Sequence, residues 1–255
     1  MPRPISDSAT TGRALDREPE RELVRDHDHF FATFADDWWA NDCPTAPLRS
    51  FNAPRFAYFD QFVDGDWADQ KVLDVGCGGG FTTEFLGERG ADVSGVDVSP
   101  DLVAAADRHA RQAGLKIDYS VGRAERLPYP DASFSVVTCV DVLEHVASPG
   151  EVVREVHRVL APGGVFLYDT INRTTAARLM MIWLPERLLR AVPQGTHDWH
   201  DFITPAEMVG HLGAAGFTSL GRMSGMAILG KRHDGSARIV PTRDLSCTYM
   251  GAARR

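Results

Sequence analysis

The sequence is poor in several features that would assign it to common classes of protein. It has three lysines and a formal net charge of −8, so no basic surface for general nucleic-acid binding is expected. No apolar run reaches transmembrane length, and the acidic N-terminus lacks the apolar region of a signal peptide. These absences favour a globular protein of the cytoplasm.

Cysteines are also few, and none of them forms a recognisable pair. Cys43, Cys77, Cys139 and Cys247 lie far apart and include no C-x-x-C motif. Neither a disulfide framework nor a zinc site is indicated, and reduced thiols in a cytoplasm fit the spacing better.

What is present predicts one large domain with additions. A chain of 255 residues with 44% apolar and 24% charged residues is long enough for a single sizeable core. Residues 1–24 are polar and predict a disordered tail. Residues 25–66 are rich in aromatics at helical spacing and predict an N-terminal helical lid. Residues 67–255 form the main domain, with an inserted lid at 172–204.

An apolar run, a glycine-rich turn and a helix-like segment follow one another between residues 71 and 86. The run 71–75 predicts a strand, and the glycines at 76, 78, 79 and 80 predict a tight turn. Such a turn brings the backbone N–H groups of a helix N-terminus against a small ligand. A plain turn between two core elements has the same local pattern, so the residues around it must identify the ligand.

Two acids beside the turn indicate that ligand. Dinucleotide-binding turns read G-x-G-x-x-G, but position 81 is Phe, so no pyrophosphate site is predicted. Asp74, before the turn, suits a cationic amine, and Asp97, at the end of the next strand, suits the two hydroxyls of a ribose. S-adenosylmethionine has an amino-acid end and a ribose but no phosphate, and it is the predicted cofactor. The same site includes Gly76, Gly78, Gly80 and Val98.

Strand-like and helix-like segments alternate from residue 71 to about 170, which predicts a parallel sheet with helices on both faces. Ligands bind at the carboxyl ends of such strands. The turn at 122–128 lies where an adenine would be held, with Ala124 offering a backbone N–H and Glu125 an acceptor. Strands near 218–226 and 245–251 are expected to close the sheet at an antiparallel edge, and 231–244 is expected to be a charged surface loop.

Longer motifs accompany the glycine turn. They are Trp38-Trp39, Asn52–Arg55, Asp74–Gly80, Asp97, Cys139–Val146, Leu160–Gly164, Asn172-Arg173, Val192–Asp198 and Phe202–Glu207. With these motifs the sequence resembles class I S-adenosylmethionine-dependent methyltransferases, and more closely the ubiquinone-biosynthesis O-methyltransferases. The resemblance covers residue 30 onward. It implies an α/β fold with a Rossmann-like, doubly wound, mostly parallel seven-stranded sheet, an antiparallel last strand, an N-terminal helical lid and an inserted lid helix.

The resemblance also implies roles on the cofactor side of the site. Gly76 and Asp97 would bind S-adenosylmethionine, and Arg55 would reach its carboxylate from the lid. Val140 would line the adenosyl pocket. A charge at the surface with a buried stem is the alternative for Arg55.

A divalent metal held after the fourth strand is a further property of the family. The matching residues are Asp141, Glu144 and His145, with Asn172 as a further oxygen ligand, so Mg²⁺ or another divalent cation is a candidate cofactor. Asp141 stands where the family has Glu. Glu144-His145 also occurs in methyltransferases that bind no metal, which leaves both interpretations open.

The family methylates a phenolic hydroxyl on a polyprenylated ring, and that hydroxyl must lose its proton. A metal would stabilise the phenolate, or a histidine would take the proton. His145 and His197 are the candidate bases, with Asp198 as the group that orients His197. A loop histidine that caps local backbone is the alternative for His197.

The segment 174–192 combines apolar residues with three arginines and with Pro185, which is expected to break a helix. It suits a lid over a hydrophobic aromatic substrate, or a peripheral contact with the inner membrane face. An inserted helix packed on the core is the alternative. Two other functions stay open: a tailoring methyltransferase that modifies a thiol, carboxylate or other hydroxyl, and a non-catalytic S-adenosylmethionine-binding module.

Overall fold

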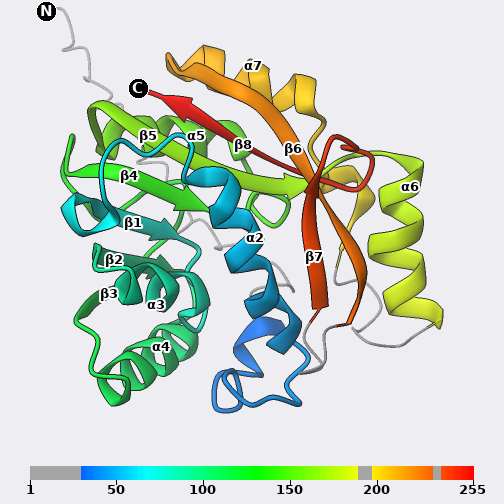
Figure 1. The fold of residues 1–255 in the computed structure, drawn as a ribbon, viewed down its shortest axis with the longest axis horizontal. Coiled ribbons are helices and arrows are strands. Elements are labelled where there is room, and N and C mark those ends of the chain that lie inside the picture. The colour runs from blue at the N-terminus through cyan, green and yellow to red at the C-terminus, as the bar shows by residue number, and fades with distance from the viewer. Residues whose placement is uncertain (1–29, 189–196, 232–236) are drawn as a thin grey trace, which may run out of the picture.

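A computed structural model of the chain describes residues 30–188, 197–231 and 237–255. The tail predicted at 1–24 lies outside these residues. One eight-stranded sheet organises the molecule, in the order β3-β2-β1-β4-β5-β8-β6-β7 (Figure 1). The strands are β1 (Lys71–Val75), β2 (Asp92–Asp97), β3 (Ile117–Val121), β4 (Phe134–Cys139), β5 (Leu160–Ile171), β6 (Thr218–Lys231), β7 (Ala237–Thr242) and β8 (Thr248–Arg254).

The first five strands run parallel, and the last three are antiparallel. Parallel pairs join β3 to β2, β2 to β1, β1 to β4 and β4 to β5. Antiparallel pairs join β5 to β8, β8 to β6 and β6 to β7. The α/β class and the mostly parallel sheet are therefore confirmed, with eight strands in place of seven.

Helices cover both faces of the sheet, as the alternating pattern predicts. They are η1 (Ala46–Leu48), α2 (Arg49–Phe59), η2 (Trp67–Asp69), α3 (Phe81–Glu88), α4 (Pro100–Gln112), α5 (Pro149–Val159), α6 (Thr175–Ala177), η3 (Arg178–Leu188), η4 (Trp199–Asp201) and α7 (Pro205–Ala215). One core cluster joins α5 and α7 to the sheet through Leu73, and the other joins α2, α3 and α4 to it through Val72. Neighbouring strand residues point to opposite faces, so β1 supplies both cores.

Helix ends follow the caps that the sequence encodes. The Ser99 hydroxyl accepts the Leu102 N–H at the start of α4, directly before Pro100. Thr204 and Glu207 form a reciprocal capping box at the start of α7, and Gly216 ends that helix with φ of 92°. These local signals position α4 and α7 at the predicted residues.

Three segments differ from their predicted structure. Residues 33–39 form successive turns with i to i+3 bonds, such as Phe34 N–H to Phe31 O, in place of a regular helix. Pro185 lies inside the π-helix η3 and does not end it. Much of the predicted surface loop 231–244 belongs to the β6–β7 hairpin, because the Ile239 side chain packs inward and is 3% exposed.

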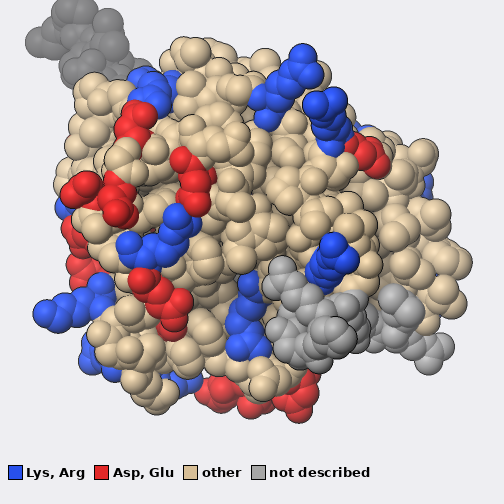
Figure 2. Space-filling view, in the orientation of Figure 1, with Lys and Arg blue, Asp and Glu red and all other residues tan. Residues whose placement is uncertain are grey.

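The surface carries both signs of charge. On the face shown in Figure 2, acidic and basic side chains lie near one another, and neither sign forms a continuous band across the described atoms. No helix in the described part of the chain has the length and apolar character needed to cross a bilayer.

Candidate active site

The glycine turn joins β1 to α3 and bounds a cavity of about 340 Å³ at the carboxyl ends of the parallel strands. Gly76, Gly78 and Gly80 have φ values of 72°, 52° and 99°, which only glycine adopts readily. A Cβ on Gly76 would also lie 2.3 Å from a methyl group of Val142. Backbone conformation and close packing therefore both require glycine in this turn.

Gly79 is required for a different reason. Its φ lies outside the left-handed region, but a Cβ there would lie 2.4 Å from the indole ring of Trp38. Trp39 donates its indole N–H to Gly79 O at 2.8 Å and stacks on His109 with ring centroids 3.7 Å apart. The N-terminal segment thus packs directly on the turn and covers the cavity from outside.

Asp97 ends β2 with its carboxylate held in place by backbone. One oxygen accepts the Gly78 N–H at 2.8 Å, and the other accepts the Ser99 N–H at 2.9 Å. Asp97 and Val98 both line the cavity. At this position in the cavity wall, a pair of ribose hydroxyls would donate to the carboxylate.

Asp74 lies beneath the turn and not in the cavity. It is 1% exposed, and one oxygen accepts the Thr138 hydroxyl proton at 2.7 Å. Burial raises the pKa of Asp74 to about 7, although the Thr138 bond opposes this. Asp74 is absent from the residues that line the cavity, so it does not meet a cofactor amine directly in this conformation.

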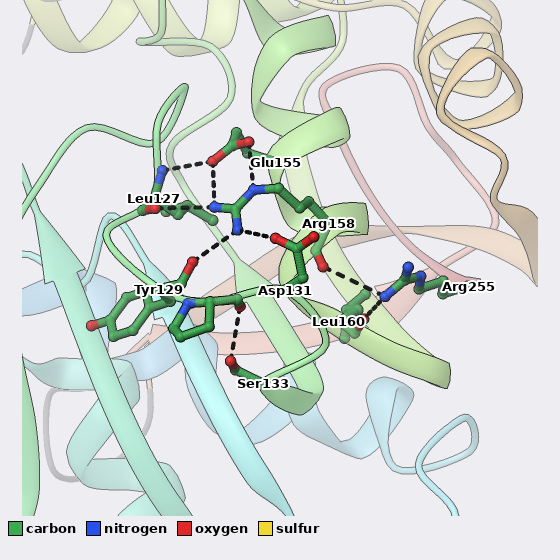
Figure 3. A network of polar contacts seen from close by, with 9 residues as sticks. Leu127, Tyr129, Asp131, Ser133, Glu155, Arg158, Leu160 and Arg255 are labelled. Atoms are coloured by element: carbon green, nitrogen blue, oxygen red, sulfur yellow. Dashed lines mark hydrogen bonds and ion pairs between the residues drawn. The ribbon is translucent and has the colours of Figure 1, made fainter.

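The loop after β3 forms one side of the cavity and is anchored to α5. Ala124 and Glu125 line the cavity. Figure 3 shows Arg158 of α5 reaching the loop, where its guanidinium donates to Leu127 O at 3.0 Å and Tyr129 O at 2.8 Å. Glu155 accepts the Leu127 N–H at 2.9 Å. The loop is therefore held at several backbone positions by one helix.

Arg55 is the centre of a buried ionic group. Its side chain is 1% exposed and lies 2.6 Å from a carboxylate oxygen of Asp141 and 2.6 Å from one of Asp169. Burial alone would lower the pKa of Arg55, but the two carboxylates outweigh burial and raise it. Asp169 also accepts the Asp141 N–H at 2.8 Å, and Asp141 has a φ of 57°. Arg55 lines the cavity, with its charge compensated by protein carboxylates.

Glu144 is buried next to this group. It is 5% exposed, and it accepts the Thr170 hydroxyl proton at 2.9 Å. Burial first, and then the charges of Asp141 and Asp169, raise the pKa of Glu144 to about 8.

The four residues predicted to hold a metal do not assemble into a metal centre. Asp141 is engaged by Arg55, and the Asn172 amide donates to Leu245 O at 2.7 Å without lining the cavity. Within residues 30–188, 197–231 and 237–255, no group of three His, Cys, Asp or Glu is placed to bind a metal ion. The guanidinium already supplies the positive charge that the carboxylates face, so these donors do not fit a divalent cation in this conformation.

Two histidines lie next to each other in the wall of the cavity. His145 and His197 both line the cavity, and their rings are 5.4 Å apart between centroids. Phe31, Met181 and Met226 add apolar wall around them. Asp198 points elsewhere, because it is exposed and accepts the His200 N–H at 2.9 Å as the cap of η4. The predicted His197–Asp198 pair is therefore replaced by other contacts of His197.

Comparison with known proteins supplies the family. A methyltransferase domain model matches residues 73–168. A ubiquinone biosynthesis O-methyltransferase of Xanthomonas axonopodis pv. citri is 40% identical over 197 residues, which cover 77% of this chain and 81% of that protein. The chain belongs to the ubiquinone biosynthesis O-methyltransferase family. Another relative of that name, from Xylella fastidiosa, is 39% identical over 77% of this chain and 79% of its own length.

Solved structures agree at the level of fold. An S-adenosylmethionine-dependent methyltransferase of Thermotoga maritima, described as a possible histamine N-methyltransferase, has a TM-score of 0.59 at 17% identity and covers 89% of this chain and 98% of its own. One from Aquifex aeolicus has a TM-score of 0.55 at 17% identity, over 82% and 97% of the two chains. As a member of its family, the protein is an S-adenosylmethionine-dependent O-methyltransferase.

Most of the residues predicted for this family member do meet in one cavity. The predicted residues that line it are Arg55, Gly76, Gly78, Asp97, Val98, Ala124, Glu125, Val140, Asp141, Glu144, His145 and His197. Asp74, Gly80, Asn172 and Asp198 are not among the lining residues.

Sequence reasoning missed two contributors to the site of this O-methyltransferase. Asp169, 2% exposed, holds Arg55, and the signal for it was an acid inside the apolar run 165–171. Trp38, from the segment whose aromatics indicated lid packing, covers the glycine turn. Glu186 contacts His197, and no local pattern in the sequence connects those two residues.

Proposed function

We propose that the protein transfers a methyl group from S-adenosylmethionine to a phenolic, catechol-like hydroxyl on a hydrophobic, prenylated ring that is a quinone precursor. The observation that carries this proposal is the pair of neighbouring histidines, His145 and His197, in the wall of the cavity that the glycine turn also bounds. The apolar wall beside them suits an aromatic ring. The relatives from Xanthomonas and Xylella, which are ubiquinone biosynthesis O-methyltransferases by name, support the same class of acceptor.

The residues of this chain divide the work between the donor and the acceptor. When bound, S-adenosylmethionine supplies a methyl group on a positively charged sulfur. Asp97 and the glycine turn hold the donor, so that the acceptor oxygen approaches the methyl carbon from the side opposite the sulfur. His197 or His145 would take the hydroxyl proton as the acceptor oxygen receives the methyl group that the bound donor supplies.

A methyl-transfer assay tests the proposal. The panel contains catechols, prenylated phenols, thiols and carboxylates, each with and without a chelator. We expect transfer to prenylated catechols, and within about two-fold the same rate after chelation, because Arg55 already compensates Asp141 and Asp169. Transfer to thiols or carboxylates alone would replace this acceptor class with another, and no transfer would leave a binding module.

Replacement of His197 gives a sharper prediction. His197→Gln removes a proton acceptor in the cavity and is expected to lower kcat by about 10²-fold or more, because general base catalysis contributes about 10²–10⁴-fold. His200→Gln is the matched control, since His200 is exposed and does not line the cavity. Equal rates for the two variants would remove His197 from the mechanism and leave His145.

We also propose that η3 contacts the surface of a membrane. Four of its apolar side chains are strongly exposed: Leu179 by 52%, Met180 by 48%, Trp183 by 46% and Leu188 by 62%. Met181 of the same helix lines the cavity, so η3 connects the substrate cavity to this apolar surface. A hydrophobic acceptor dissolved in a bilayer would then enter from the membrane side.

A further inference from the structure

The end of the β6–β7 hairpin carries two adjacent apolar side chains that are strongly exposed. Ile228 is 63% exposed and Leu229 is 58% exposed. Neighbouring residues of a strand point to opposite faces, so both faces of the hairpin are open to solvent at this end. Adjacent apolar side chains on a protruding element are typical of a contact surface.

The hairpin end lies close to the cavity and to η3. Met226 of β6 and Met181 of η3 both line the cavity, so the strand and the helix bound the same space. The register of β6 is regular from Met226 to Ile228, which places Ile228 about 7 Å further along the strand. Figure 1 shows the end of this hairpin next to the helix labelled α6, which continues as η3. The two exposed apolar surfaces therefore flank one cavity.

The charges that these elements expose are basic. The exposed charged side chains of η3, β6 and β7 are Arg178, Arg187, Arg222 and Arg238, and the only acidic residue within the bounds of the three elements is Glu186, which is 5% exposed. The whole chain has a formal net charge of −8, so this local excess of arginine does not follow from its composition. Apolar side chains with basic ones among them match an anionic bilayer, whose headgroups attract cations and whose acyl chains accept apolar groups.

We propose that the end of the β6–β7 hairpin is a second membrane contact, which together with η3 holds the cavity toward an anionic bilayer. This inference rests on the proposed function, and it extends the contact from one element to two. Two linked contacts bind more strongly than either one and fix the orientation of the protein on the surface. A hydrophobic acceptor then passes between the two elements from the bilayer into the cavity.

Vesicle flotation of hairpin variants tests this contact. The vesicles contain phosphatidylcholine, with or without phosphatidylglycerol. Joint replacement Ile228→Thr and Leu229→Thr removes the apolar surface and keeps a residue type that favours strands, and we expect it to weaken binding to anionic vesicles by about ten-fold. Arg238→Gln is expected to weaken that binding by about five-fold and to leave binding to pure phosphatidylcholine unchanged. Val209→Thr on α7 is the control, because Val209 is 49% exposed and lies outside these elements.

The outcomes separate the hairpin from η3 and from other partners. If the double variant binds as Val209→Thr does, while Trp183→Ser still weakens binding, the hairpin contact is overturned and η3 alone remains. A native dimer in sedimentation that the double variant dissociates would assign the hairpin end to a second copy of the chain, and would also overturn the proposal. Thermal unfolding confirms that the variants fold, and the two single replacements are measured if the double variant does not. If the acceptor class is wrong, the panel assay fails while the vesicle result stands.

Discussion

Gly79 leaves space for the N-terminal segment that covers the turn, and not for the ligand. The other glycines of the turn have positive φ values, but Gly79 lacks a side chain because Trp38 lies flat against it. Trp39 adds a hydrogen bond to the same residue. The glycine-rich pattern in the sequence therefore reflects two requirements, a positive φ and close packing. Only the structure shows which requirement applies to each glycine.

Gly79→Ala tests this difference. The new methyl group would overlap the Trp38 ring, so we expect the free energy of unfolding to fall by about 1–3 kcal/mol, together with a change in tryptophan fluorescence as the segment shifts. Urea denaturation measures the first effect. Gly213→Ala on α7 is the control, because nothing lies within 4 Å of its added Cβ, and we expect it to be neutral or stabilising. Equal behaviour of the two variants would contradict the packing argument.

Helix α5 packs on the sheet and holds the loop after β3, which lines the cavity. Its amphipathic pattern and Pro149 at the first turn position the helix, and Arg158 in its last turn then reaches across to the loop. Asp131 accepts from the same guanidinium at 2.8 Å. The position of α5 therefore helps to fix the loop that contains Ala124 and Glu125.

Arg158→Ala should loosen the loop without displacing the helix. We expect faster amide exchange at Leu127 and a loss of about 1–2 kcal/mol in the free energy of unfolding, because several backbone acceptors lose their partner. Arg154→Ala on the same helix removes an exposed arginine that forms a surface ion pair with Glu151, and it is expected to have little effect. Unchanged exchange at Leu127 in Arg158→Ala would show that the loop holds itself.

Elements with local signals were predictable, and elements formed by distant contacts were not. The caps at Ser99 and Thr204 are encoded within a few residues, so α4 and α7 begin where expected. Strand β7 depends on the packing of Ile239 against residues that are distant in the sequence. The charged residues around Ile239 led to the prediction of a surface loop instead. The glycine turn is one continuous motif and was predictable for that reason, whereas the Arg55–Asp169 and Glu186–His197 contacts join separate segments that no local pattern connects.

At the scale of the whole molecule, two groups of helices lie at opposite ends. Helices α3 and α4 stand at one end, and the helix labelled α6, which continues as η3, stands at the other (Figure 1). The sheet between them holds the glycine turn, while η3 carries the exposed apolar side chains. Membrane contact through η3 would thus leave the cofactor side in water.

Liposome flotation tests that orientation. Trp183→Ser removes a large, exposed interfacial side chain, and we expect it to lower binding to anionic vesicles several-fold while the fold is retained. Val209→Ser is the control, because Val209 is an apolar residue of α7 that is 49% exposed on another part of the surface. Absence of native binding to anionic vesicles, or equal losses in both variants, would exclude this surface as the contact.

The position of Arg55 has a consequence for modularity. The methyltransferase domain shared with many proteins spans residues 73–168, and Asp141 lies within it. The cation that compensates Asp141 comes from α2, well before that span, and it bridges to Asp169 just after it. Residues 73–168 are therefore not a portable unit here: grafted alone onto another scaffold, they would carry Asp141 without its counter-ion, so α2 has to accompany them.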